Sequence, residues 1–316
     1  MRKAWLVITL LLVVLMGCQT DQVEENDEAD TDTDTSEVGE DTTYTVTDDL
    51  GDAFTFEEVP ETVVSLTPSN TEILFALGQG DKVVGVTEYD NYPEEALDIE
   101  NVSDALHINE ERIIELDPDV IFAYTIGNQE LLQSIKAAGI PVFVISDALT
   151  IDDVYNDIIQ IAEVMGVEEQ GEALVQDIQA EMEEVEQLVN SVEETPSVYF
   201  EISPSPDIYT IGANTFQQAV LEAAGVENVF GDVEGWIPVN EEDVVERNPD
   251  IIITTVNFTD DPEGEIMSRS GWSGITAVEN GEVFLVDSDI MSRPGPRIGQ
   301  AVRILAETVY PELTNE

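Results

Sequence analysis

The chain has 316 residues, of which 69 are acidic and 10 are basic, so its formal net charge is −59. This balance argues against nucleic acid as a partner, because phosphate binding needs clustered lysine and arginine. It also predicts a halophilic protein, because such self-repulsion weakens a compact state in dilute buffer and molar salt screens it.

The N-terminal segment predicts export. Two basic residues precede an apolar stretch at 4–16, which is short for a membrane-spanning helix of roughly 20 residues and is typical of a signal peptide over 1–17. Residues 15–18, Leu-Met-Gly-Cys, resemble the lipobox of bacterial lipoproteins, and Cys18 is the only cysteine. This resemblance implies a lipid anchor at Cys18 that holds the chain on the extracytoplasmic face of the cell membrane. An incidental cysteine after an ordinary signal peptide is the alternative.

Residues 18–43 are predicted to form an acidic, disordered tether. The stretch from Gln19 to Asp41 is rich in Asp, Glu and Thr and contains no aromatic residue. It cannot bury enough apolar surface to offset the entropy lost on ordering. A flexible tether would keep the folded part close to a membrane partner.

Residues 44–150 alternate strand-like and helix-like segments, which predicts an N-terminal α/β lobe with a parallel sheet. Strands are predicted at Val63–Leu66, Val83–Val86, Val120–Tyr124 and Val142–Ile145, and helices after Ser69, after Asn109 and over Gln129–Ala138. The spacing of Ser69 and Glu72 indicates a capping box at the start of the first helix. We therefore interpret Glu72 as a structural residue.

The alternation stops at residues 151–194, which are predicted to be linker helices. Apolar residues recur every three or four positions over Asp152–Met165 and Glu168–Val192. The resulting helical span of about 40 residues is interrupted only by Gly166 and Gly171. We expect this span to act as a stiff spacer.

Residues 195–316 resume the alternation and are predicted to form a C-terminal α/β lobe. Strands are predicted at Val198–Ile202, Ile251–Thr255 and Val283–Val286, and helices at Phe216–Ala224 and Ile298–Val309. Residues 108–122 align without a gap with 239–253, at a constant offset of 131, and seven of the fifteen pairs are identical. A repeat on either side of a helical span predicts two Rossmann-like lobes with parallel sheets, joined by a single long rigid helix.

The chain resembles the ABC-importer binding proteins for iron chelates, haem and cobalamin. The resemblance is carried by V-S-L-T-P-S-N-T-E at 64–72, Y-D-N-Y-P at 89–93, the helices after Asn109 and Asn240, and S-R-P-G-P-R at 292–297. It implies an α/β protein that captures a bulky metal chelate, cobalamin or a ferric siderophore, in a cleft between two lobes. The chain would deliver this ligand to a permease and ATPase complex. The resemblance implies neither an enzyme nor a bound cofactor.

Glu111 and Glu242 occupy equivalent places in the repeat. Asn109 and Asn240 are predicted N-caps, which makes each glutamate the second residue of its helix. The resemblance implies that these two glutamates pair with arginines of the transporter, and two equivalent anchors suit a two-fold symmetric partner. Simple complementarity to the helix dipole is the alternative, and the preceding glutamates satisfy it equally well.

The ligand is expected among aromatic residues on loops after strands, where α/β folds place ligands. By resemblance to cobalamin-binding members, Tyr89, Tyr124, Tyr209 and Trp236 line the ligand site. Their rings offer broad contact at low entropy cost, although each could equally be a core or rim residue. An aromatic residue that is usual in those members is replaced by Ala105.

Arg293, together with Asp289, is predicted to face the cleft and to hydrogen-bond the ligand. Pairing of the two arginines, Arg293 and Arg297, with local carboxylates such as Asp287 or Asp289 is the alternative. Arg297 and Arg269 are further candidates. The scarcity of basic residues favours a near-neutral ligand, such as cobalamin or a hydroxamate chelate, over a highly anionic catecholate.

The sequence gives little support to two other classes of function. A protein for a bare transition metal would need clustered histidines, and the chain has one histidine, His107, so no metal site is predicted. An exported hydrolase could pair His107 with a serine nucleophile. The sequence lacks a Gly-x-Ser-x-Gly elbow, however, and residues 271–274 only come near it.

Overall fold

A computed structural model defines the fold. It describes residues 43–104, 107–124, 132–192 and 194–315. The predicted signal peptide, Cys18, most of the predicted tether and Ala105 lie outside the described residues. No described helix is both long and apolar enough to span a bilayer.

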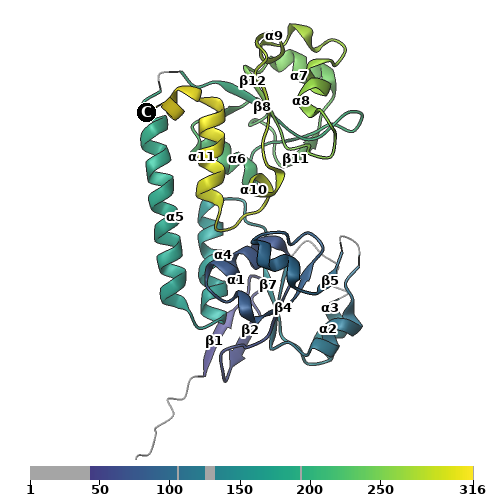
Figure 1. Ribbon diagram of the computed structural model, residues 1–316, viewed down its shortest axis with the longest axis vertical. Coiled ribbons are helices and arrows are strands. Elements are labelled where there is room, and N and C mark those ends of the chain that lie inside the picture. Colours follow the sequence, from purple (N-terminus) through teal and green to yellow (C-terminus); the bar gives the residue numbers. More distant parts are fainter. Residues whose placement is uncertain (1–42, 105–106, 125–131, 193, 316) are drawn as a thin grey trace, which may run out of the picture. The chain divides into compact units, whose positions relative to one another are not determined.

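The N-terminal lobe is built on a five-stranded parallel sheet with the order β5-β4-β3-β6-β7 (Figure 1). Its strands are β3 (Val63–Ser65), β4 (Val83–Thr87), β5 (Asn101–Ser103), β6 (Val120–Tyr124) and β7 (Val142–Ile145). The central strands β3 and β6 and the strand β7 are largely buried on both faces, as is usual for a parallel sheet between helices.

Helices cover the two faces of this sheet. They are α1 (Pro68–Ala76), α2 (Glu110–Leu116), α3 (Leu132–Ala137) and α4 (Ile151–Val164), with short 3₁₀ helices η1 (Gly80–Lys82) and η2 (Glu94–Asp98). On β6, Phe122 packs in the same core cluster as Ile73 of α1. Its neighbour Ile121 points the other way and packs in a second cluster with Ile113 of α2, following the two-residue period of a strand.

A hairpin that the sequence analysis missed precedes this sheet. The strands β1 (Tyr44–Thr47) and β2 (Ala53–Phe56) pair antiparallel. The Tyr44 hydroxyl donates a hydrogen bond of 2.6 Å to the carbonyl oxygen of Val164 at the end of α4. The hairpin is thereby fastened to α4.

The linker span consists of two helices. Gly166 has a left-handed φ of 64°, which ends α4 and turns the chain into α5 (Glu168–Val189). The two helices pack side by side (Figure 1). A Cβ at Gly171 would lie 2.5 Å from the Cβ of Ala162, so glycine permits this close approach. The predicted long helix is therefore α5, with 22 residues, and α4 folds back along it instead of extending it.

The C-terminal lobe has a mixed sheet with the order β11-β9-β8-β12-β13, and β10 also pairs with β8. Its strands are β8 (Ser197–Ser203), β9 (Tyr209–Ile211), β10 (Glu227–Asn228), β11 (Trp236–Pro238), β12 (Ile251–Thr254) and β13 (Val283–Leu285). The predicted parallel pairing holds for β10, β8, β12 and β13. The strands β9 and β11 extend the sheet in antiparallel fashion.

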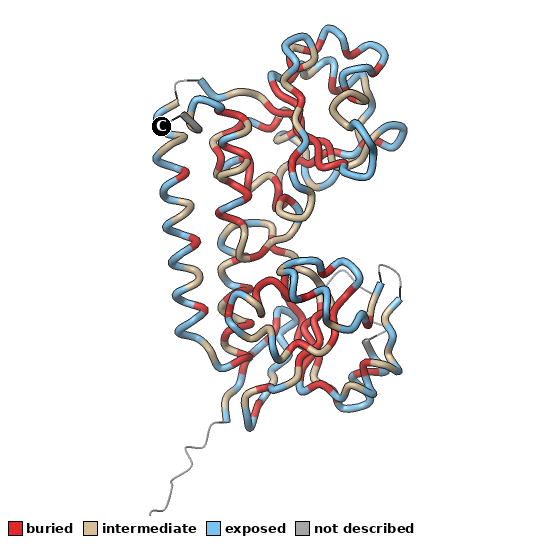
Figure 2. The backbone as a smooth tube through the Cα atoms, viewed as in Figure 1, coloured by how far each residue is buried: buried red, intermediate tan, exposed pale blue. Residues whose placement is uncertain are grey.

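The helices of this lobe complete the fold. They are α6 (Phe216–Ala223), α7 (Glu241–Arg247), α8 (Pro262–Met267), α9 (Thr276–Asn280), α10 (Ser288–Ser292) and α11 (Ile298–Val309), with 3₁₀ helices η3 (Trp272–Gly274) and η4 (Pro311–Asn315). One core cluster includes Phe122 of the first lobe, Val198 of the second and Val302 of α11. The buried residues follow the strands and the inner faces of these helices (Figure 2). The core therefore continues from one lobe into the other.

The sequence repeat is also a structural repeat. In the first copy, the Asp119 carboxylate accepts a hydrogen bond of 2.9 Å from the backbone N–H of Thr62. In the second copy, the Asp250 carboxylate accepts one of 3.0 Å from the backbone N–H of Ser197. Each aspartate thus joins its strand to the start of the neighbouring strand in the same way.

Candidate functional site

A buried ion cluster joins the two lobes at Glu72. This carboxylate, on α1, accepts hydrogen bonds from Arg297 Nε at 2.7 Å and from Arg293 Nη1 at 3.0 Å. The Glu72 side chain is only 1% exposed. An unpaired charge at such a depth would be strongly destabilising, so the two arginines are needed to compensate it. Both come from the segment between α10 and α11, and the cluster therefore ties that segment to the N-terminal lobe.

The predicted capping box at Ser69 and Glu72 is wrong. The helix begins at Pro68, with Thr67 as its N-cap and without a capping side-chain bond. Proline fits the first position of a helix because its missing N–H would have no partner there. Glu72 is then the fifth residue of α1, too far along to reach back to the cap.

Arg293 pairs with Asp289, as the alternative of local ion pairing predicted, and both side chains also contact the N-terminal lobe. Arg293 Nη2 lies 3.0 Å from Asp289 Oδ1 and donates to the carbonyl oxygen of Tyr89 at 2.9 Å. Asn91 donates to Asp289 Oδ2 at 2.8 Å and accepts from Arg293 Nη1 at 2.8 Å. Asp287, the other carboxylate of that alternative, caps α10. The loop at residues 89–91 is thus held against α10.

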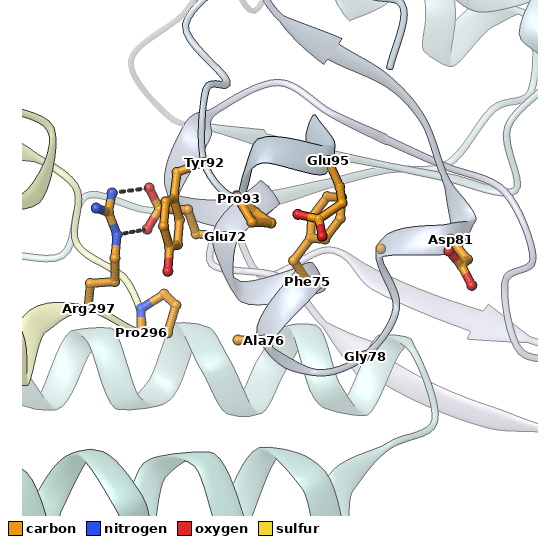
Figure 3. Close-up of a pocket in the computed structure, with 11 residues that line it drawn as sticks. Glu72, Phe75, Ala76, Gly78, Asp81, Tyr92, Pro93, Glu95, Pro296 and Arg297 are labelled. Carbon is orange, nitrogen blue, oxygen red and sulfur yellow. Dashed lines mark hydrogen bonds and ion pairs between the residues drawn. The ribbon is translucent and has the colours of Figure 1, made fainter. Parts of the chain in front are cut away.

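Arg297 borders a cavity of about 620 Å³ (Figure 3). Its guanidinium lies 4.1 Å from the centre of the Tyr92 ring, in a cation–π contact. The close-up shows this pair at one end of the cavity and Asp81 at the other. The lining contains none of the six residues predicted to bind the ligand. Arg297 therefore has a structural role here, between Glu72 and Tyr92.

Tyr209 and Trp236 share one face of the antiparallel β9–β11 pair. The register places Trp236 opposite Ile211 and Pro238 opposite Tyr209, which makes the two aromatic residues diagonal neighbours on the same side. Their residues are 40% and 43% exposed. Trp236 Nε1 donates to the Gln217 side chain of α6 at 3.3 Å. The C-terminal lobe therefore presents a fixed aromatic surface to solvent.

The two tyrosines of the N-terminal lobe differ from this pair and from each other. Tyr89 follows β4 and is exposed, and a hydrogen bond with Glu88 raises the pKa of its phenol. Tyr124 is the last residue of β6, is half-buried, and is aligned with Ile145 of β7. A hydrogen bond thus joins the backbone of Tyr89 to Arg293, and the strand register puts Tyr209 and Trp236 on one face, whereas Tyr124 stands at the end of β6 beside Ile145.

The predicted helix caps at the repeat are confirmed. The Asn109 side chain accepts a hydrogen bond from the backbone N–H of Arg112, and Asn240 accepts one from that of Asp243. The second residue of each helix is therefore a glutamate, Glu111 in one lobe and Glu242 in the other, and both are exposed.

Arg269 is buried and has no open side toward a ligand, so its prediction as a further ligand candidate is wrong. Its guanidinium is bidentate to Glu201, at 2.6 and 2.8 Å, and also contacts Glu265. The Arg269 side chain is 3% exposed and lies over the Trp272 ring. Burial raises the pKa of Glu201, and the hydrogen bonds from Arg269 oppose that shift.

Little positive charge is left for an anionic ligand. Of the eight lysines and arginines in the described part of the chain, seven form ion pairs with carboxylates. They are Lys82, Arg112, Arg247, Arg269, Arg293, Arg297 and Arg303. A highly anionic chelate would have to displace existing partners before it could use most of these cations.

The residues behind the two rival functions lie in unremarkable surroundings. The His107 ring is exposed, and its Nδ1 lies 3.4 Å from Asp104. The segment at 271–274 contains the 3₁₀ helix η3 and the fully buried Trp272, and it is not a strand-to-helix elbow. Among the described residues, no three His, Cys, Asp or Glu side chains are grouped so as to hold a metal ion.

Residues 63–290 match the family of periplasmic binding proteins. The chain is 36% identical over 317 residues to YvrC of Bacillus subtilis strain 168, an uncharacterized ABC transporter substrate-binding lipoprotein, covering 99% of this chain and 98% of that protein. It is 32% identical over 247 residues to the vitamin B12-binding protein of Vibrio parahaemolyticus, covering 78% and 88%.

A solved structure from Staphylococcus epidermidis, described as a possible iron-binding, periplasmic solute-binding protein, has the same fold. It matches with a TM-score of 0.74 and 35% sequence identity, over 80% of this chain and 100% of that one.

Proposed function

Because this chain belongs to the periplasmic binding protein family, it is the solute-binding component of an ABC importer, and we propose that its solute is a cobalamin. A relative that matches 78% of the chain is named for vitamin B12 binding, and another is a substrate-binding lipoprotein. The partners are then a permease and an ATPase in the membrane. An anchor at Cys18, outside the described residues, would hold the chain beside them.

The observation that carries this proposal is the aromatic face of β9 and β11. Tyr209 and Trp236 are fixed on one side of the strand pair and remain exposed. Such a surface suits a broad, nearly flat ring system, which buries a large area without ordering many side chains. A corrin ring has that shape.

The charge distribution supports a near-neutral ligand. Seven of the eight described basic side chains are already paired with carboxylates. A catecholate chelate would leave several negative charges without partners, and burying unpaired charge is costly. The amide groups of cobalamin can instead form hydrogen bonds with neutral side chains, or with charged side chains that are already paired with each other.

The remaining ligand contacts are proposed at the edge of α10. Arg293 and Asp289 form an ion pair there, and the backbone of Tyr89 is held against them. The Asp289 carboxylate is partly exposed and can accept a hydrogen bond from an amide. Together with Tyr124, these groups would complete the site that Tyr209 and Trp236 begin.

Docking to the importer is proposed at Glu111 and Glu242. Both are exposed, and both stand second in helices that repeat between the lobes. Equivalent carboxylates on two lobes suit basic residues on two symmetry-related permease subunits.

The proposal is tested by isothermal titration at about 2 M KCl, a salt concentration that screens the surface charge. The titrants are cyanocobalamin, haemin, a ferric hydroxamate and a ferric catecholate. We expect saturable one-to-one binding of cyanocobalamin. Saturation by another titrant, with no heat from cyanocobalamin, would rule out the proposed ligand.

The aromatic face is tested by Trp236→Ala and Tyr209→Ala in the same titration. Each variant should weaken cyanocobalamin binding about tenfold, because a lost aromatic contact costs about 1–1.5 kcal/mol. The control is Leu50→Ala, since Leu50 is an exposed apolar residue in the turn of the β1–β2 hairpin. It should leave the affinity unchanged.

A further inference from the structure

Each copy of the repeat exposes one large aliphatic side chain at the same position. Ile114 on α2 is 40% exposed and Val245 on α7 is 39% exposed, and their numbers differ by the repeat offset of 131. Nine of the ten residues in 110–119 also match their counterparts in 241–250 as buried, half-buried or exposed. The two helices therefore present similar surfaces.

The exposed aliphatic residue lies on the same helix face as the proposed docking glutamate. Ile114 follows Glu111 by three positions and Val245 follows Glu242 by three, which makes each pair neighbours on a helix surface. The residue just before each aliphatic one is fully buried and already anchors its helix in the core. Packing within the lobe therefore does not require a second aliphatic side chain at either position.

A cavity opens beside each of these helices at another equivalent position. In the N-terminal lobe, Ile108 borders a cavity of about 440 Å³. In the C-terminal lobe, Val239 borders one of about 650 Å³. The first cavity is lined by β5 and the residues just before α2, whereas the second is also lined by α7, so only the glutamate and the aliphatic side chain repeat in the same relation.

We infer that Glu111 with Ile114, and Glu242 with Val245, form two matching docking patches for the two symmetry-related permease subunits of the importer. This inference rests on the proposed docking function and adds its apolar component. Each permease subunit would present a basic side chain to the glutamate and an apolar side chain to Ile114 or Val245. The repeated patch, and not a single residue, would then match the symmetry of the partner.

Salt explains why docking in this protein would need an apolar component. Exposed ion pairs lose most of their attraction when the Debye length falls to about 3 Å at molar salt. Contacts between apolar side chains are not screened by ions. Ile114 and Val245 would therefore retain affinity under conditions in which the glutamates contribute little.

A second copy of this chain is a poor occupant for these patches. Both patches carry glutamates, and the whole chain has a formal net charge of −59, so two copies repel each other at low salt. A partner with basic residues is electrostatically complementary, as a permease surface with exposed arginines would be.

The test measures binding of the ligand-free protein to its cognate permease and ATPase complex in lipid nanodiscs, by biolayer interferometry at about 0.15 M and about 2 M KCl. The double variant Ile114→Ser and Val245→Ser should bind at least about tenfold more weakly at both salt concentrations. The double variant Glu111→Gln and Glu242→Gln should lose affinity at low salt and differ little from wild type at high salt.

The matched control is Leu50→Ser. Leu50 is 45% exposed and lies in the turn of the β1–β2 hairpin, outside α2 and α7. It should bind like wild type. Unchanged thermal unfolding of all variants would show that the folds are intact.

Three outcomes would overturn the inference, and they are distinguishable. If the glutamate variant loses binding and the aliphatic variant does not, docking stands and its apolar component is wrong. If sedimentation shows that the aliphatic variant changes self-association alone, the patches serve a second copy. If wild type does not bind the complex at either salt concentration, the proposed docking function fails as well.

Discussion

Two buried glutamates, one in each lobe, are both paired with arginine, but their ion pairs connect different parts of the molecule. Glu201 of β8 is bidentate to Arg269, 68 residues away in the same lobe. Glu72 of α1 is held by Arg293 and Arg297, which lie 221 and 225 residues away in the other lobe. Both carboxylates are 1% exposed, so each depends on its arginines.

The difference lies in what each cluster connects. The Arg269 cluster joins β8 to the loop before η3, and it therefore stabilises a single lobe. The Glu72 cluster also holds Arg293, which contacts the backbone of Tyr89, so it joins the lobes beside the proposed ligand groups. We expect the first cluster to govern folding and the second to govern movement between the lobes.

The largest effect is expected from Arg269→Ala. Removing the arginine leaves Glu201 as an unpaired buried charge, which costs about 3–5 kcal/mol. Denaturant unfolding should show this loss in the free energy of unfolding. Arg112→Ala removes exposed ion pairs with Glu100 and Glu115, and it should cost no more than about 1 kcal/mol. Equal losses in the two variants would contradict the expectation that a buried ion pair contributes more to the free energy of unfolding than an exposed one.

A smaller loss, with a change in shape, is expected from Glu72→Gln. The amide preserves the volume but removes the charge that Arg293 and Arg297 share, so the free energy of unfolding should fall by about 1.5–3 kcal/mol. Solution scattering should show a wider spread of lobe arrangements than in wild type. Arg269→Lys, which perturbs the cluster inside one lobe, should leave that spread unchanged. If the scattering of Glu72→Gln is also unchanged, the Glu72 cluster does not control the contact between the lobes.

Asp157 on α4 is also a buried carboxylate, but it lies beside other acids. Burial raises its pKa from the ordinary 3.8 to about 8, and the charges of Asp49 and Asp153 add to the shift. The folded state thus keeps a proton that the unfolded chain releases near pH 4. Stability is therefore full below that pH and is lost as the pH rises through about 8.

The variant Asp157→Asn has no such proton to lose. Between pH 6 and pH 9, wild type should lose roughly 2–3 kcal/mol more of its free energy of unfolding than this variant does. Thermal and denaturant unfolding at both pH values measure the difference. Parallel pH profiles for the two proteins would show that Asp157 does not titrate in this range.

Much of the fold could be predicted because its signals are local. The strands at Val120–Tyr124 and Val142–Ile145 and the helix at Ile298–Val309 have the predicted bounds. Each is a dense apolar segment or an amphipathic one with clear ends. The sequence repeat alone predicts the two equivalent helices, α2 and α7.

The role of Glu72 could not be read from local spacing. Its partners lie more than 200 residues away, and the neighbouring Ser69 offered a false capping box. Pro68 indicates a different start for the helix, because proline favours the first helical position and the cap is then Thr67. The antiparallel strands β9 and β11 were missed because three residues are too few for a periodic pattern.

Several expectations from the sequence remain predictions. They include the salt requirement, the lipid anchor at Cys18, and the assignment of Tyr89, Tyr124, Asp289 and Arg293 to the ligand site. The structure has placed Tyr89, Asp289 and Arg293 in one group of contacts.

The most direct test is a crystal structure of the protein with cyanocobalamin. We expect the corrin ring to lie against Tyr209 and Trp236, with the Arg293 and Asp289 pair within hydrogen-bonding distance of its amides. A ligand bound elsewhere, with the aromatic face of β9 and β11 still open to solvent, would contradict the proposed capture of cobalamin on that face.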